Sequence, residues 1–108
     1  MSGPLLLPTW RDLEVTHPQV VATMRAYLDQ IACVLRPGSV GGADLALRSL
    51  ATYLADQHPE LHRVRDIGRA HIEGFKPWLA ARPGQNRARL TPATIAHRLG
   101  TLRVFFLR

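Results

Sequence analysis

A pair of histidines, one cysteine and two tyrosines are the side chains here whose chemistry most often serves catalysis or metal binding. His58 and His62 are four residues apart, but a proline separates them and no third ligand is near, so two solvated surface histidines are expected. Tyr27 and Tyr53 fall in or beside apolar helix stripes, and Cys33 has no base close in the sequence. We therefore expect no catalytic residue, no metal, no cofactor and no small-molecule substrate.

Positive charge is concentrated toward the C-terminus. All eight acidic residues lie within residues 1–73, whereas residues 74–108 hold Lys76 and six arginines with no acid. Such a segment attracts polyanions because no carboxylate in it neutralises the field. Thirteen of the fourteen basic residues are arginine, a bias that a GC-rich genome also produces, so charge alone does not decide the partner.

The basic loop around Arg87 and Arg89 leads directly into a well-marked helix start. Thr91 is a good N-cap and Pro92 suits the first helical position. A helix N-terminus carries unsatisfied N–H groups and partial positive charge, which favours phosphate binding. The candidate contacts that follow along the helix are Thr94, His97, Arg98 and Thr101. The structural alternative is a capped surface helix with a solvated polar face.

Four helices are expected to position these residues, because apolar residues recur at helical spacing and no window alternates with period two. Pro18 begins the first, which runs to about residue 35. Ser39 caps the second, which runs to about residue 57. The third covers residues 66–82, where Pro77 should kink it or end it early. The fourth follows Thr91 and buries Ile95, Leu99, Leu102, Phe105 and Phe106. Residues 1–17 are expected to form an irregular arm.

The chain has 108 residues, of which 46% are hydrophobic, and one cysteine. This length fits a single domain, assigned here to residues 18–108. No apolar run approaches the roughly 18 residues of a membrane span. The expected fold is therefore an all-α, compact four-helix bundle, and the expected location is cytoplasmic, without membrane contact.

The order of the apolar patterns resembles one known family. Residues 39–54 contain a Ser-capped helix with Leu47-x-x-Leu50-x-x-x-Leu54, and a later segment has Asp66-Ile67 followed by Ile72-x-x-Phe75-x-x-x-Leu79. The closing segment reads Thr91-Pro-Ala-Thr-Ile, then Leu99, then Leu102-Arg-Val-Phe-Phe106. Residues 18–108 thus resemble the N-terminal core-binding domain, also called SAM-like, of tyrosine recombinases and phage integrases. Departures include Ala43, where the family often has an aromatic residue, and Gly68, where it usually has a Ser or Thr cap.

The resemblance implies a DNA-binding domain that forms half of a clamp around a recombination site, with its second and fourth helices against the duplex. Strand cleavage in the family belongs to a separate catalytic domain, so these residues alone are expected to cleave nothing. Double-stranded DNA is the expected partner, with other recombinase protomers on the same DNA. The DNA-contacting residues would be Arg48, Arg87, Arg89, Thr91, Thr94, His97, Arg98, Thr101 and Arg103, and with less support Lys76.

Two alternatives stay open at this point. Arg103 would instead bridge helices if a buried acid faces it. The whole domain would instead be a helical protein–protein interaction module, with Leu45 and Cys33 on its partner surface.

Overall fold

The computed structural model describes residues 7–81 and 92–107, which form helices and contain no strand. The α-helices are α1 (Trp10–Thr16), α2 (Pro18–Ala32), α3 (Pro37–Gln57), α4 (Arg69–Ala80) and α5 (Pro92–Leu107), with a short 3-10 helix, η2 (Val64–Asp66), before α4. The all-α prediction is confirmed.

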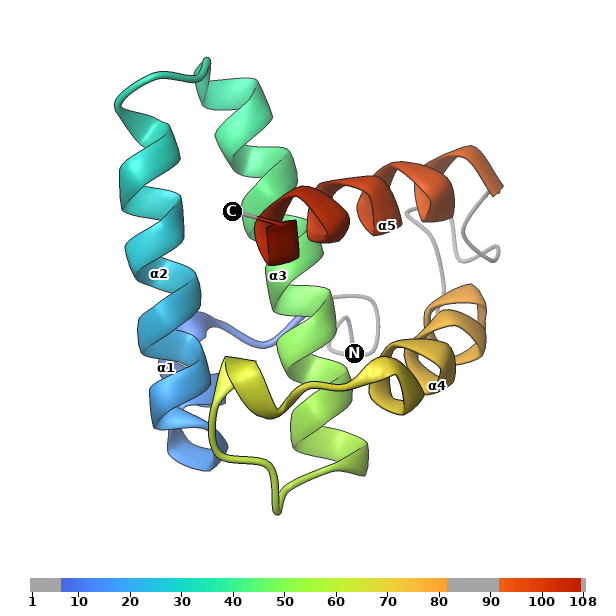
Figure 1. Ribbon diagram of the computed structural model, residues 1–108. Coiled ribbons are helices and arrows are strands. Elements are labelled where there is room, and N and C mark those ends of the chain that lie inside the picture. The colour runs from blue at the N-terminus through green and yellow to red at the C-terminus, as the bar shows by residue number, and fades with distance from the viewer. Residues whose placement is uncertain (1–6, 82–91, 108) are drawn as a thin grey trace, which may run out of the picture.

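Helix α3 is the centre of the packing, because each of the other α-helices contacts it. In Figure 1, α2 runs alongside α3, α5 crosses in front of it, and α4 lies beside its C-terminal half. The α3 residues Leu47, Leu50 and Leu54 are completely buried, as are Phe75 and Leu79 from α4. Leu102 and Phe105 bring α5 into the same core.

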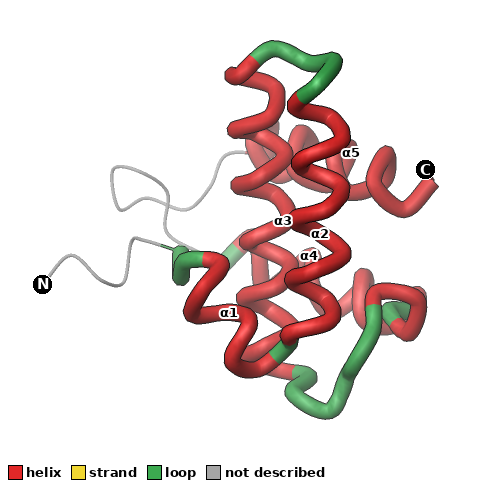
Figure 2. The backbone as a smooth tube through the Cα atoms, turned by 90° about the vertical axis from the view of Figure 1, so that its left-hand side faces the viewer, coloured by secondary structure: helices red, strands yellow, loops and turns green. Residues whose placement is uncertain are grey.

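The expectation of an irregular arm over residues 1–17 is wrong for residues 10–16, which form α1. Thr9 and Asp12 make a reciprocal capping box that satisfies two backbone N–H groups at the helix start. Leu13 is 3% exposed and joins the core. Figure 2 shows α1 lying against α2 and α3, so the described residues hold five α-helices instead of four.

Helix boundaries also differ from the prediction. The α2 helix ends at Ala32, earlier than residue 35, and α3 begins at Pro37 with Arg36 as its N-cap instead of Ser39. Proline's fixed φ and missing N–H suit the first helical position, and here that preference outweighs serine capping.

The third predicted helix starts later than expected, because residues 64–66 form η2 and Gly68 precedes α4. Pro77 neither ends α4 early nor prevents it from reaching Ala80. The proline lies near the C-terminal end of the helix, so the one backbone hydrogen bond that it removes leaves the rest of the helix intact.

Candidate nucleic-acid interface

Four of the predicted DNA-contacting residues lie together on α5, facing α3. Two hollows at this helix junction share Gly42 and His97 as lining residues, and have volumes of about 290 and 340 Å³. Thr94 and Arg98 line the first, and Thr101 lines the second. A Cβ atom built on Gly42 would lie 3.7 Å from the His97 ring. We call Thr94, His97, Arg98 and Thr101 the α5 row.

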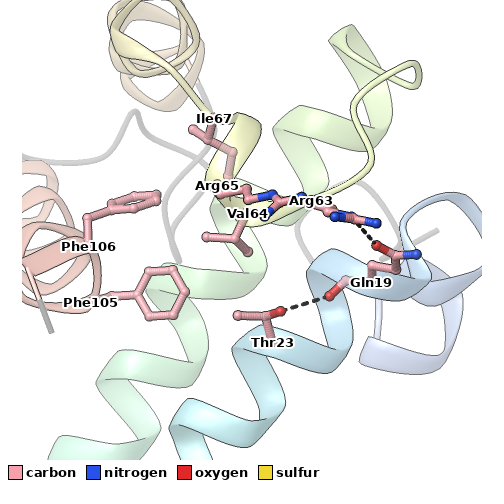
Figure 3. A pocket seen from close by; sticks show the side chains of 8 residues that line it. All are labelled: Gln19, Thr23, Arg63, Val64, Arg65, Ile67, Phe105 and Phe106. Carbon is pink, nitrogen blue, oxygen red and sulfur yellow. Dashed lines mark hydrogen bonds between the residues drawn. The ribbon is translucent and has the colours of Figure 1, made fainter.

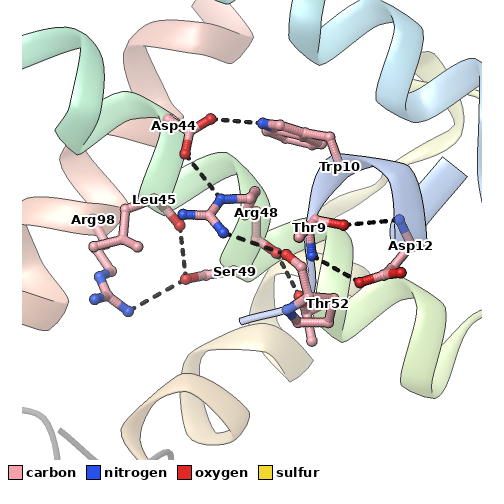
Figure 4. Close-up of polar contacts among 10 residues, drawn as sticks. Thr9, Trp10, Asp12, Asp44, Leu45, Arg48, Ser49, Thr52 and Arg98 are labelled. Atoms are coloured by element: carbon pink, nitrogen blue, oxygen red, sulfur yellow. Dashed lines mark hydrogen bonds and ion pairs between the residues drawn. The ribbon is translucent and has the colours of Figure 1, made fainter. Parts of the chain in front are cut away.

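Arg98 connects this row to the central helix. Its Nη1 donates to Ser49 Oγ at 3.3 Å, and that hydroxyl in turn donates to the Leu45 carbonyl at 2.9 Å (Figure 4). Ser49 is completely buried on α3, so the polar link is part of the helix crossing. The guanidinium of Arg98 is therefore positioned at the α3–α5 junction and not held by α5 alone.

Arg48, the α3 member of the predicted set, has its charge compensated within the fold. Its Nε lies 2.9 Å from Asp44 Oδ2, and its Nη1 donates to the Pro8 carbonyl at 3.4 Å. The other oxygen of Asp44 accepts a 2.6 Å hydrogen bond from Trp10 Nε1 (Figure 4). Arg48 thus links α3 to the residues just before α1 and carries less free charge than the sequence suggests.

Arg103 lies apart from the α5 row. It lines an apolar hollow between α4 and α5, together with Ile72, Lys76 and Phe106. Lys76 is paired with Glu73 at 3.1 Å. Within residues 7–81 and 92–107, no carboxylate lies within ion-pair distance of Arg103, so the alternative of a helix bridge through a buried acid finds no support in that part of the chain.

Three predicted contacts, Arg87, Arg89 and Thr91, lie outside the residues that the structure describes. The described part of the candidate interface therefore consists of residues on α3 and α5.

Arginine also gathers at a place that sequence reasoning missed. A hollow of about 520 Å³ between α2, η2 and α5 is lined by Arg63 and Arg65 on one side and Phe105 and Phe106 on another (Figure 3). Arg63 Nε donates to Gln19 Oε1 at 3.1 Å, which fixes its side chain. The two arginines are 40 to 43 positions from the two phenylalanines in sequence, so no local pattern could have indicated the hollow.

Among the residues considered for catalysis, Tyr53 Oη and His58 Nε2 lie 3.1 Å apart, within hydrogen-bond distance. Cys33 is exposed and its thiol contacts the Asp29 carbonyl at 3.5 Å. Tyr27 and Tyr53 are buried, and burial raises the pKa of the Tyr53 phenol above its ordinary value. A raised pKa keeps the phenol protonated and weakens it as a nucleophile.

Of the two histidines expected to be solvated at the surface, His62 fits that expectation and His58 is partly buried. His62 is exposed, whereas His58 lies beside Glu60 and against the ring of His71, with ring centroids 4.7 Å apart. His71 is 13 residues further along, on the first turn of α4, and the sequence held no signal for this contact.

Comparisons of the chain with protein-family models, with curated proteins and with solved structures found no match. Among the described residues, no helix is long and apolar enough to cross a membrane.

Proposed function

We propose that this chain is a DNA-binding domain of a tyrosine-recombinase-like protein, which grips duplex DNA through α3 and α5 and cleaves no strand by itself. The observation that carries the proposal is the α5 row, in which hydroxyl, imidazole and guanidinium groups line adjoining hollows beside α3. These are the group types that bind phosphates and the edges of base pairs.

The roles within the row follow from chemistry. Arg98 would contact a phosphate, since a guanidinium forms paired, charge-assisted hydrogen bonds with phosphate oxygens. Thr94, His97 and Thr101 would face base edges as α5 approaches the groove. Arg87 and Arg89 would add phosphate contacts just before the helix, where the N-terminal partial charge of α5 also attracts an anion. The proposal includes a cytoplasmic location and other protomers on the same DNA.

An amide NMR titration with a random-sequence duplex at two salt concentrations tests this function. We expect salt-sensitive shifts along residues 39–48 and 85–101, because non-specific binding is electrostatic and strongest at low salt. Absence of shifts at low salt would remove DNA as the partner.

The basic loop is tested by replacing Arg87 and Arg89 with alanine together. Each lost phosphate contact lowers the slope of log affinity against log salt by about 0.9, so the double variant should lower the slope by roughly 1 to 2 units. Arg25→Ala is the matched control, since Arg25 is an exposed arginine on α2. An unchanged slope in the double variant would exclude both residues from the contact set.

A helical protein–protein interaction module is the second candidate, and exposed apolar residues favour it. Val34 is 79% exposed, Val104 61% and Leu107 74%. A stable dimer in sedimentation analysis, together with no duplex affinity at low salt, would support this module in place of the DNA-binding domain.

A further inference from the structure

Three potential metal ligands meet where α3 ends and α4 begins. His58 follows the last turn of α3, Glu60 lies two residues later, and His71 is on the first turn of α4. Each offers one ligand atom, and the three atoms lie within 4.8 Å of one another. We call these residues the His58 cluster.

One of the three ligand separations in the cluster already matches that of a tetrahedral zinc site. Zinc ligands at about 2.0–2.1 Å from the metal are roughly 3.3 Å from each other. His58 Nδ1 and Glu60 Oε2 are already 3.4 Å apart. The Glu60 side chain is 70% exposed, so it can follow the metal without disturbing the core.

The remaining nitrogen of His58 has the kind of partner that supports a metal ligand. Tyr53 Oη lies 3.1 Å from His58 Nε2. If Nδ1 binds a metal, Nε2 carries the proton and donates it to the phenol oxygen, which fixes the orientation of the ring. Gly74 leaves room for that oxygen, because a Cβ at this position would overlap it.

His71 must change one hydrogen bond to bind a metal. Its Nδ1 accepts from the Gly68 N–H at 2.8 Å, which places the proton of the neutral ring on Nε2. A neutral ring that binds a metal through one nitrogen carries its proton on the other, so His71 has to release this bond. Gly68 is exposed, and water can replace the histidine as its partner.

From this geometry we propose that His58, Glu60 and His71 form a binding site for zinc(II), with water as the fourth ligand. Two imidazoles and one carboxylate match the donor set of open zinc sites. The bound ion would join the end of α3 to the start of α4 and fix the segment between them. The site is independent of the proposed DNA contacts, since its residues are not part of the α5 row.

Titration of the full chain with zinc chloride, followed by amide NMR, tests the proposal. We expect saturation at one equivalent, shifts concentrated in residues 58–71, and a displaced Gly68 amide as its hydrogen bond is released. The thermal midpoint should rise with zinc and return with a chelator, because a ligand that binds the folded state stabilises it. Shifts spread over all five histidines, or no saturation, would overturn the site.

Variants separate the cluster from adventitious histidine binding. His71→Ala should weaken zinc affinity by more than 100-fold, and Tyr53→Phe, which removes only the supporting oxygen, by roughly 10-fold. His62→Ala is the matched control, an exposed histidine outside the cluster, and should bind as the wild type does. Equal affinity in His71→Ala and wild type, or equal losses in His71→Ala and His62→Ala, would refute the proposal.

Discussion

Gly74 occupies a position on α4 where any side chain would overlap the Tyr53 hydroxyl. The Tyr53 ring packs between His58, Phe75 and Trp78, so it has little room to move. The glycine is thus explained by a close approach between α3 and α4, and not by an unusual backbone conformation.

Gly74→Ala should therefore destabilise the protein by about 1–3 kcal/mol, the usual cost of overpacking, even though alanine is the better helix former. Tyr53→Phe should largely rescue it, because the nearest remaining ring atom, Cζ, lies 3.5 Å from the new Cβ. Urea unfolding of the two single variants and the double variant measures this coupling. Gly100→Ala on α5 is the control: nothing lies within 4 Å of its Cβ position, and a stabilisation of up to about 1 kcal/mol is expected. Additive effects of Gly74→Ala and Tyr53→Phe would contradict the account.

His17 is 1% exposed, and neither ring nitrogen has a hydrogen-bond partner among residues 7–81 and 92–107. Unpaired polar atoms in a core lose hydration without compensation. His17→Leu should accordingly raise the free energy of unfolding by about 1–2 kcal/mol, measured by urea denaturation. A lower stability in this variant would mean that the imidazole makes a favourable contact after all.

Burial raises the pKa of Tyr53 above its ordinary value of 10.0, so the folded state favours the protonated phenol. The unfolded chain then ionises first as the pH rises past about 10, and stability falls from there toward the folded-state pKa. Tyr53→Phe should lose less stability than the wild type between pH 9 and 11. Parallel curves of unfolding free energy against pH would contradict this assignment.

At the scale of elements, one carboxylate joins the first helix to the third. Asp44 accepts from Trp10 Nε1 and pairs with Arg48, whose guanidinium also reaches the Pro8 carbonyl. The side chains of Arg48 and Asp44 are 24% and 31% exposed, so solvent reduces the strength of the pair.

Asp44→Asn should cost about 1 kcal/mol, because one charge-assisted contact is lost while the shape is kept. Under the proposed function it should also tighten duplex binding, since Arg48 on α3 then carries an uncompensated charge. Asp29→Asn makes the same change in net charge on an exposed α2 residue and is the control. Equal gains in affinity from both variants would show that Arg48 has no special place in the interface.

The starts of α2 and α5 were predicted well from sequence, whereas the start of α3, at Pro37, was not. Pro18 and Pro92 begin α2 and α5 as expected, and the 100° spacing along α5 grouped Thr94, His97 and Thr101 as the structure does. The short α1 was missed because seven residues give too little periodicity, although Thr9 and Asp12 hold a recognisable capping pattern.

The contacts that depend on tertiary packing could not be predicted. Trp10 and Asp44 are 34 positions apart, and Arg63 and Gln19 are 44 apart. Local spacing carries no information about such pairs, and the same holds for His71 beside His58. The Asp44–Arg48 pair has the i,i+4 spacing of neighbours on a helix and could have been predicted, but the contact of Arg48 with the Pro8 carbonyl, 40 positions away, could not.

At the scale of the whole molecule, stability is centred on α3. Leu47, Leu50 and Leu54 are completely buried along its C-terminal half, and the four other α-helices all contact α3. Regions that open locally are those with fewer buried contacts and weaker backbone hydrogen bonding.

Hydrogen exchange should therefore show two levels of protection. Amides of residues 47–54 should exchange only through global unfolding, whereas amides near Pro77 in α4 should exchange sooner, because the proline removes one helical hydrogen bond. Exchange measured across low urea concentrations distinguishes the two. Equal opening free energies for α3 and the last turn of α4 would contradict this ordering.

The corner between α1 and α2 has a consequence for assembly. His17 alone separates the two helices, with φ −131° and ψ 67°, and Pro18 follows it. A residue before proline avoids helical torsions, so the chain cannot straighten here into one rod from Trp10 to Ala32. Such a rod would carry α1 away from its own α3 and present it to the α3 of a second copy, which is how domain-swapped dimers begin. Pro18 thus keeps α1 on its own chain.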